Sequence, residues 1–316
     1  MNALASDWLR ALRGRRSQLA FSRRLGYRSN IAYRWEAGRC FPSASATLRL
    51  VTTLGGDVRA SLASFYRSTP AWLAEKDPCS VPGVAHLLDD LRGSTKLAEL
   101  ARRSGYSRFA VTRWVHGRAD PTLPEFLTLI EYTTRRALDF VASFVDPATL
   151  PSARDAWRML QGARAAAYDQ PWSHAVLRAL ELDAYSALPE HESGWIARRL
   201  GMTEELERSC LEILERSGQI RFAGSHYVPV QILAVDTRAD PLRARELRAG
   251  WASVGVQRLR AGAPGVLSYN LSSVSRADLE RLERLQRAYY REMVNIIAES
   301  VPAECVVLYA AQLLEL

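Results

Sequence analysis

The chain contains a segment that occurs twice. Residues 12–42 align without a gap to residues 91–121, at a constant offset of 79 positions. The first copy has Arg23-Arg24, Gly26-Tyr27, Arg34-Trp35, Gly38-Arg39 and Pro42, which recur in the second as Arg102-Arg103, Gly105-Tyr106, Arg113-Trp114, Gly117-Arg118 and Pro121. Repetition at a fixed period indicates a repeated structural unit, so we expect two modules of the same fold.

Each copy has the pattern of two short helices separated by a glycine turn. In the first copy, a helix with Phe21 on its buried face ends at Gly26, because glycine tolerates the left-handed conformation of a tight turn. A second helix is predicted to begin near Ser29, to bury Trp35 and to end at Gly38. This second helix presents basic and polar side chains, which is the layout of a helix that enters the major groove of DNA.

The pattern resembles the lambda-repressor/Cro-like (XRE) helix-turn-helix family. That family has a leucine-alanine pair, a turn glycine, a tryptophan often followed by glutamate, then a glycine and a downstream proline. The matching residues of the first copy are Gly26, Trp35-Glu36, Gly38 and Pro42. Those of the second are Leu100-Ala101, Gly105, Trp114, Gly117 and Pro121, with Val115 in place of the glutamate. The resemblance implies two DNA-reading modules in one chain.

The resemblance and the exposed helix faces together indicate which side chains contact DNA. Gln18 falls where the family often has a phosphate-contacting glutamine, and Leu97 takes that place in the second copy, which is therefore the weaker candidate. The expected contacts of the first copy are Gln18, Arg23, Arg24, Arg28, Ser29, Asn30, Tyr33, Arg34 and Arg39. Those of the second are Arg102, Arg103, Arg108, Phe109, Thr112, Arg113 and Arg118.

The positive charge of the chain is concentrated in its first module. The whole chain has a net charge of +8, and residues 1–70 hold twelve arginines and three acidic residues, a net of +9. Residues 71–150 hold ten basic and ten acidic residues, and residues 151–316 have a net charge of −1. A phosphate-binding surface requires such an excess, so the charge favours DNA contact by the first module over a merely solvated basic face.

Prolines and glycines divide the chain into five predicted parts. Breakers at Thr69-Pro70 and across residues 77–83 separate the two modules, and further prolines at 147 and 151 close the second. The predicted parts are a first XRE-like module at 1–70, a second at 78–146, a helical linker at 147–171, a winged-helix-like unit at 172–235 and an α-β-α-β part at 236–316. The expected fold class is mainly α, with tandem helix-turn-helix bundles and a small α+β C-terminal part.

Residues 172–235 have the pattern of a helical unit with a β-hairpin. Helices are predicted at 172–185, at 193–200 and after a Thr203 cap, followed by a hairpin around Gly224-Ser225. This order resembles a winged helix, whose third helix normally reads DNA. The corresponding helix here carries Glu204, Glu205, Glu207, Glu212 and Glu215 against Arg208 and Arg216. Because phosphate would repel these acids, we expect a structural or dimerising unit.

The C-terminal stretch alternates between helical and strand-like patterns. A helix is expected at 243–261, a strand at 265–274, a helix after a Ser275 cap and a closing strand at 304–316. Roughly from residue 170 onward, the chain resembles the uncharacterised C-terminal domain of a family of bacterial proteins with N-terminal XRE-like modules. A two-stranded sheet is marginal alone, so we expect pairing across a two-fold axis to complete it.

No pattern in the sequence indicates an enzyme. The five histidines show no metal-ligand spacing, and HExxH, Walker A, GxSxG and GxGxxG motifs are absent. We therefore expect no catalytic residues, no metal and no cofactor. No apolar run approaches the length of a membrane span, and the N-terminus lacks the order of a signal peptide. The four cysteines form no CxxC pair, so reduced thiols in a cytoplasm are expected.

These patterns predict a cytoplasmic, nucleoid-associated transcription regulator that binds double-stranded DNA sequence-specifically, as a dimeric repressor. The homodimer is expected to form through the C-terminal half, with no membrane partner, and an unknown effector is left open. Two alternatives stay open: a protein-interaction or ligand-sensing adaptor that uses helix-turn-helix folds, and a DNA-processing accessory factor. Salt-dependent, sequence-selective binding separates the regulator from the adaptor, and binding at promoters separates it from the accessory factor.

Overall fold

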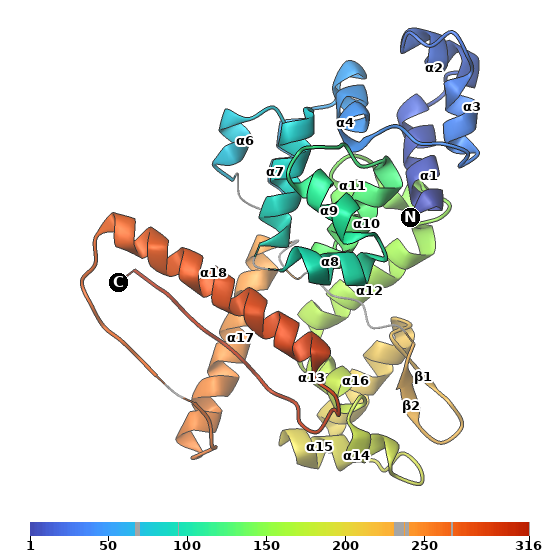
Figure 1. The fold of residues 1–316 in the computed structure, drawn as a ribbon. Coiled ribbons are helices and arrows are strands. Elements are labelled where there is room, and N and C mark those ends of the chain that lie inside the picture. The colour runs from blue at the N-terminus through green and yellow to red at the C-terminus, as the bar shows by residue number, and fades with distance from the viewer. Residues whose placement is uncertain (67–69, 94, 231–236, 238–239, 267, 316) are drawn as a thin grey trace. The chain divides into compact units, whose positions relative to one another are not determined.

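The structure is a computed structural model that describes residues 1–66, 70–93, 95–230, 237, 240–266 and 268–315 (Figure 1). Helices dominate among these residues, and the one sheet that they contain has two strands, which confirms the prediction of a mainly α fold. The chain divides into two compact units, residues 1–158 and residues 159–316. Each unit has its own hydrophobic core.

The first unit contains both copies of the repeat. The structural correspondence extends beyond residues 12–42 and 91–121, and each copy is named from here on with its flanking helices. The first copy forms α1 (Asn2–Arg13), α2 (Gln18–Arg24), α3 (Ile31–Glu36), α4 (Ala44–Thr53) and α5 (Val58–Tyr66). The second forms α7 (Val81–Arg92), α8 (Leu97–Ser104), α9 (Arg108–Val115), α10 (Leu123–Thr134) and α11 (Ala137–Ala142). Between them in the chain lies α6 (Trp72–Glu75), and the short 3-10 helix η1 (Pro147–Thr149) follows α11. The bounds of α7 are those of α1 shifted by 79, so the two copies correspond helix by helix.

Short polar side chains and glycines set the ends of these helices. Ser17, Ser43 and Ser107 cap α2, α4 and α9, because each side chain accepts a hydrogen bond from a backbone N–H of the first turn. Gly26 and Gly105 follow α2 and α8 with φ of 81° and 73°, the left-handed region that glycine adopts without steric cost. Each copy therefore has a pair of short helices with a glycine in the turn between them.

One hydrophobic core serves both copies. Its central ring is Phe140 of α11, whose centroid lies 5.3 Å from Phe65 of α5, 5.4 Å from Phe126 of α10 and 6.2 Å from Trp8 of α1. All four side chains are buried, and edge-on aromatic contacts at these separations add to the stabilisation from burial. Because α1 and α5 belong to the first copy and α10 and α11 to the second, the two copies form one folded body.

The second unit begins within α12 (Arg154–Asp169). Its further elements are α13 (Trp172–Ala179), α14 (Asp183–Ser186), α15 (Trp195–Leu200), α16 (Glu204–Arg216), β1 (Ile220–Phe222), β2 (Tyr227–Pro229), α17 (Pro241–Arg260) and α18 (Arg276–Glu299). The two strands pair antiparallel in the predicted hairpin, with Arg221 opposite Val228. Thr203 caps α16 and Ser275 caps α18 through their side chains, so both predicted caps are confirmed.

One of the five glutamates of α16 lies inside the second unit. The Glu207 carboxylate is buried and accepts hydrogen bonds from the backbone N–H groups of Gly194 at 3.3 Å and Ala197 at 2.6 Å. These groups start α15, and the first N–H groups of a helix need acceptors from outside it. The expectation that all five acids face outward is therefore wrong for Glu207.

The predicted C-terminal strands are not present among the described residues. The described parts of 265–274 and 304–316 have no regular structure, and residues 267 and 316 lie outside the description. Val266 and Tyr269 are almost completely exposed, so no neighbouring strand covers the first of these segments. A strand needs a partner for its backbone hydrogen bonds, and the expected α-β-α-β end is wrong in both of its strands.

Two further predictions differ from the structure or lie outside it. The expected helix at 172–185 is divided into α13 and α14, because Leu182 takes an extended conformation between them. Thr69, in the first predicted linker, lies outside the described residues, as does the predicted boundary between residues 235 and 236. The range 147–171, predicted as a helical linker, contains η1 and α12, and the division between the two units falls within it.

Candidate nucleic-acid interface

The residues predicted to contact DNA in the first copy lie on and between α2 and α3. They are distributed over the end of α2 (Arg23, Arg24), the following turn (Arg28, Ser29, Asn30), α3 itself (Tyr33, Arg34) and the loop after α3 (Arg39). All eight are exposed, and Gln18, at the start of α2, is partly exposed. The structure therefore brings the predicted residues of this copy together on one helix pair.

The packing of one face of α3 determines which of its side chains are exposed. Ala32 and Trp35 are buried, and the Trp35 ring meets the ring of Tyr27 edge-on at 5.6 Å between centroids. With 3.6 residues per helical turn, this inward pair leaves Tyr33 and Arg34 on the outer side of the helix. Their exposure is thus fixed by the packing of Trp35.

Asn30 has a structural task in addition to the predicted DNA contact. Its Oδ1 accepts a hydrogen bond from the backbone N–H of Tyr33 at 3.3 Å, so Asn30 caps α3 and the helix begins at Ile31, two residues later than expected. The buried Ser22 hydroxyl donates to the carbonyl of Gln18 at 2.7 Å and accepts from the backbone N–H of Ala32 at 3.1 Å, and Asn30 Oδ1 lies 3.4 Å from it. Ser22 thereby ties the turn before α3 to α2.

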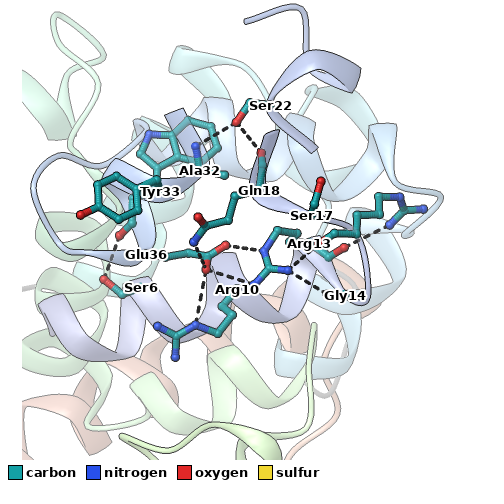
Figure 2. A network of polar contacts seen from close by, with 12 residues as sticks. Ser6, Arg10, Arg13, Gly14, Ser17, Gln18, Ser22, Ala32, Tyr33 and Glu36 are labelled. Carbon is teal, nitrogen blue, oxygen red and sulfur yellow. Dashed lines mark hydrogen bonds and ion pairs between the residues drawn. The ribbon is translucent and has the colours of Figure 1, made fainter. Parts of the chain in front are cut away.

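A carboxylate at the end of α3 organises the polar side chains around it (Figure 2). Glu36 accepts hydrogen bonds from Arg13 Nε at 2.5 Å and from Gln18 Nε2 at 2.9 Å, and Arg10 Nε lies 3.5 Å from the same carboxylate. The Glu36 side chain is only 6% exposed. Gln18, which the sequence assigns to a phosphate contact, therefore donates its side-chain N–H to Glu36 within the protein.

The network keeps Glu36 ionised. Burial alone would raise the pKa of Glu36, but the hydrogen bonds from Arg13 and Gln18 and the charges of Arg13 and Arg10 together lower it below its usual value. The hydrogen bond to Glu36 in turn raises the pKa of Arg13. Sequence reasoning missed Glu36 as a positioning residue, although the Trp35-Glu36 pair of the motif marked its place.

The arginines on the outer surface of the first copy carry uncompensated charge. Within the described residues, Arg23, Arg24, Arg28 and Arg34 form no salt bridge, in contrast to Arg13. The Arg39 guanidinium lies over the ring of Tyr33, 5.2 Å from its centroid, which is a cation–π contact and leaves its charge in place. These side chains are able to bind anionic groups without first breaking an internal ion pair.

The second copy presents fewer uncompensated charges. Arg102 and Arg103 both pair with Glu99, at 2.6 Å and 2.8 Å. The hydrogen bond from Arg102 and the charges of both arginines lower the pKa of Glu99. The remaining predicted side chains are exposed except for Thr112, which is half-buried; these are Arg108, Phe109, Arg113 and Arg118.

Two features distinguish the predicted DNA-contact surface of the second copy. Phe109 is 72% exposed, and the Arg113 guanidinium lies 5.5 Å from its ring centroid. Val115, at the position of Glu36, is buried, so the second copy has an apolar contact where the first has its polar network. The aromatic pair is retained, since the rings of Tyr106 and Trp114 meet edge-on at 5.2 Å.

Other kinds of site have little basis in the described part of the chain. No group of three or more His, Cys, Asp or Glu side chains is arranged there to hold a metal ion. Nor does any described helix combine the length and apolar character that crossing a bilayer requires.

Comparison with known proteins relates the C-terminal half of the chain to a protein family. A family model described as a domain of unknown function (DUF4423) matches residues 152–316. This range covers α12 and the whole second unit, in agreement with the expectation of an uncharacterised C-terminal domain. No curated protein and no solved structure matches the chain significantly.

Proposed function

The chain belongs to the family that shares the domain of unknown function DUF4423, and from this premise we propose that it is a sequence-specific transcription regulator that binds double-stranded DNA. In this proposal the N-terminal unit reads DNA and the DUF4423 region assembles the protein into a dimeric repressor. The observation that carries the proposal is the uncompensated positive charge on α2, α3 and the turn between them.

We interpret α2–α3 and α8–α9 as XRE-like helix-turn-helix pairs. The support is the glycine with positive φ in each turn, the buried tryptophan of each second helix and an exposed arginine on the outer face of each second helix, Arg34 and Arg113. In this interpretation α3 and α9 enter the major groove, where side chains contact base edges, while the arginines of α2 contact phosphates. Affinity then comes mainly from phosphate contacts and sequence choice from α3 and α9.

The buried Glu36 network has a clear use in this function. Arg13 and Gln18 are fixed to the end of α3 through Glu36, which links α1, the start of α2 and the end of α3. A reading helix must hold its side chains to within a fraction of an ångström of the base edges, and supporting hydrogen bonds provide that rigidity. Glu36 is therefore a positioning residue in the proposal, not a DNA contact.

The proposed assembly is a homodimer through the C-terminal half. Several apolar side chains of α18 remain exposed, among them Leu285, Tyr289 and Ile296. The acidic surface of α16 argues against DNA contact by the winged-helix-like unit, because Glu204, Glu205 and others would face phosphate. As a regulator of this kind, the protein would act at the nucleoid in the cytoplasm.

One observation favours a second candidate function for part of the molecule. The second copy has an exposed Phe109 and pairs its Arg102 and Arg103 with Glu99, which suits an apolar contact with another protein better than a phosphate contact. In that case the second copy acts as a protein-interaction adaptor while the first binds DNA.

The test is selection of bound fragments from genomic DNA by the full-length protein at two salt concentrations. The proposal predicts enrichment of a defined sequence at promoters, with binding that weakens steeply as salt is raised. Enrichment away from promoters would favour a DNA-processing accessory factor. Salt-independent binding, or no enriched sequence, would contradict the proposal.

A further inference from the structure

The two copies of the repeat are joined by a symmetric pair of backbone hydrogen bonds on either side of one pair of equivalent residues. Ser43 and Thr122 are 79 positions apart and form an antiparallel bridge. The backbone N–H of Ala44 donates to the carbonyl of Pro121 at 2.8 Å, and the N–H of Leu123 donates to the carbonyl of Pro42 at 2.9 Å. Ala44 corresponds to Leu123 and Pro42 to Pro121, at the offset of 79. The second hydrogen bond is therefore the first with donor and acceptor copies exchanged. Such an exchange is the property of a two-fold axis.

The helices around this bridge follow the same axis. Helix α1 contacts α10, and its counterpart α7 contacts α4. Two helices also contact their own counterparts in the other copy: α4 contacts α10, and α5 contacts α11. The first unit is therefore built like a symmetric homodimer, although both halves belong to one chain.

The proposed reading helices are placed equivalently about this axis. Helix α3 ends at Glu36, seven residues before Ser43, and α9 ends at Val115, seven residues before Thr122. Seven residues span at most about 25 Å, so both helix ends lie within that distance of the bridge. Half-sites one turn of DNA apart are separated by about 34 Å, which requires each helix to lie about 17 Å from the axis. The connecting segments are long enough for this arrangement.

The two reading surfaces are equivalent in position but differ in chemistry. Arg28, Ser29, Asn30 and Tyr33 correspond to Ser107, Arg108, Phe109 and Thr112. Arg34 and Arg113 are the same residue type at equivalent positions, and both are exposed. Arginine most often reads guanine in the major groove, so a guanine would recur at the equivalent place in both half-sites.

We propose that a single chain, without a second copy, reads a DNA site composed of two inverted and non-identical half-sites. The inference rests on the proposed DNA-binding function. The two-fold relation of the copies makes the half-sites inverted, and the different side chains of α3 and α9 make their sequences differ. Dimerisation through the C-terminal half would then join two complete reading units, each with its own site.

The first experiment selects binding sites from randomised duplexes with the full-length protein and counts chains per duplex by native mass spectrometry. The proposal predicts one chain on each minimal duplex, and a selected site with two different inverted halves that share a guanine. Two chains on a perfect palindrome, or a site with one half only, would overturn it. Failure to select any sequence would refute the proposed function itself, and the inference with it.

A graft provides a sharper test. Arg28→Ser, Ser29→Arg, Asn30→Phe and Tyr33→Thr together give α3 the outer surface of α9 while its buried residues stay unchanged. The selected site should become a perfect inverted repeat, still with one chain per duplex. The reverse graft consists of Ser107→Arg, Arg108→Ser, Phe109→Asn and Thr112→Tyr. It should select an inverted repeat of the half-site that α3 reads, and it replaces the first graft if that variant unfolds at a lower temperature. A folded graft that selects the unchanged asymmetric site would overturn the proposal.

Discussion

The two copies of the repeat share a scaffold and differ in a few surface and boundary positions. Both have an edge-on tyrosine–tryptophan pair and a glycine turn, yet the first ends its second helix with the buried carboxylate of Glu36 and the second with the apolar Val115. On the surface, Ala20 of the first copy corresponds to Glu99 of the second, which pairs with Arg102 and Arg103. The fold therefore depends on the residues that both copies share, while the electrostatic character of each copy depends on single amino-acid differences between them.

The largest expected effect is on DNA affinity. Reversing Arg23 and Arg24 to glutamate should weaken binding to all sequences by roughly 100-fold or more, because a hydrogen bond from a charged group is worth about 1.5–3 kcal/mol. The slope of log affinity against log salt should fall by about one for each phosphate that the variant no longer binds. Arg102→Glu with Arg103→Glu should cost less, since Glu99 already offsets these two charges. Fluorescence anisotropy at several salt concentrations measures both.

If the Arg23/Arg24 and Arg102/Arg103 reversals reduced affinity equally, both copies would bind phosphate equally, which contradicts the proposed difference between them. Unchanged affinity in both variants would remove the proposed DNA-binding surface.

The next effect is on stability. Glu36→Gln removes a buried charge that faces Arg13, Gln18 and Arg10, and should lower the free energy of unfolding by about 1–3 kcal/mol, less than for a fully buried pair because Arg10 is partly exposed. Since the folded-state pKa of Glu36 is lowered, the carboxylate stabilises the protein above the unfolded-state pKa and loses this contribution as pH falls through the folded-state pKa. Denaturant unfolding should show the gap between wild type and variant narrowing at acidic pH.

The matched control for the stability effect is Glu99→Gln, which removes a carboxylate of the second copy that is more exposed than that of Glu36. It should leave the melting temperature nearly unchanged, because exposed ion pairs stabilise little. A constant gap between wild type and Glu36→Gln across the acidic range would show that the Glu36 charge is not what stabilises the first copy.

A third effect concerns sequence choice. Arg34→Ala and Arg113→Ala should each cost about 1–3 kcal/mol on the selected site and much less on random DNA. Each variant should relax the preference in one half of the site, which competition binding with base-substituted duplexes would show. If either variant lowers both affinities equally, that arginine contacts the DNA backbone.

The smallest effect comes from exchanging the charge pattern of α2 and α8. Glu99→Ala should strengthen DNA binding by a few-fold because it removes the carboxylate that pairs with Arg102 and Arg103 and so raises the net positive charge of α8. Ala20→Glu should weaken it similarly, since a carboxylate at this exposed position lies three and four residues before Arg23 and Arg24. Changes in the same direction from both variants would show that the two copies differ for another reason.

Features with local causes were predictable from the sequence. The Thr203 and Ser275 caps, the glycine turns and the hairpin depend on residues close together in the chain, and the structure has them. The pairing of Glu99 with Arg102 and Arg103 could also have been expected from its spacing of three and four residues.

Features with distant causes were not predictable. The bond from Gln18 to Glu36 joins residues 18 positions apart, and the Ser43–Thr122 bridge joins residues 79 apart, so neither has a local signature. The predicted strand at 265–274 failed for the same reason, because an apolar alternation does not say whether a partner strand is present. The identity of equivalent residues was visible in the repeat, but not their contact.

Because the copies that meet at the Ser43–Thr122 bridge belong to one chain, their pairing responds to dilution differently from that of two subunits. Two separate subunits come apart when their concentration falls below their dissociation constant. Copies joined by one chain meet at an effective concentration in the millimolar range, which depends on the connecting segment and not on the number of molecules present. The pairing is therefore unimolecular, and a cell with a single molecule of this protein has a complete pair.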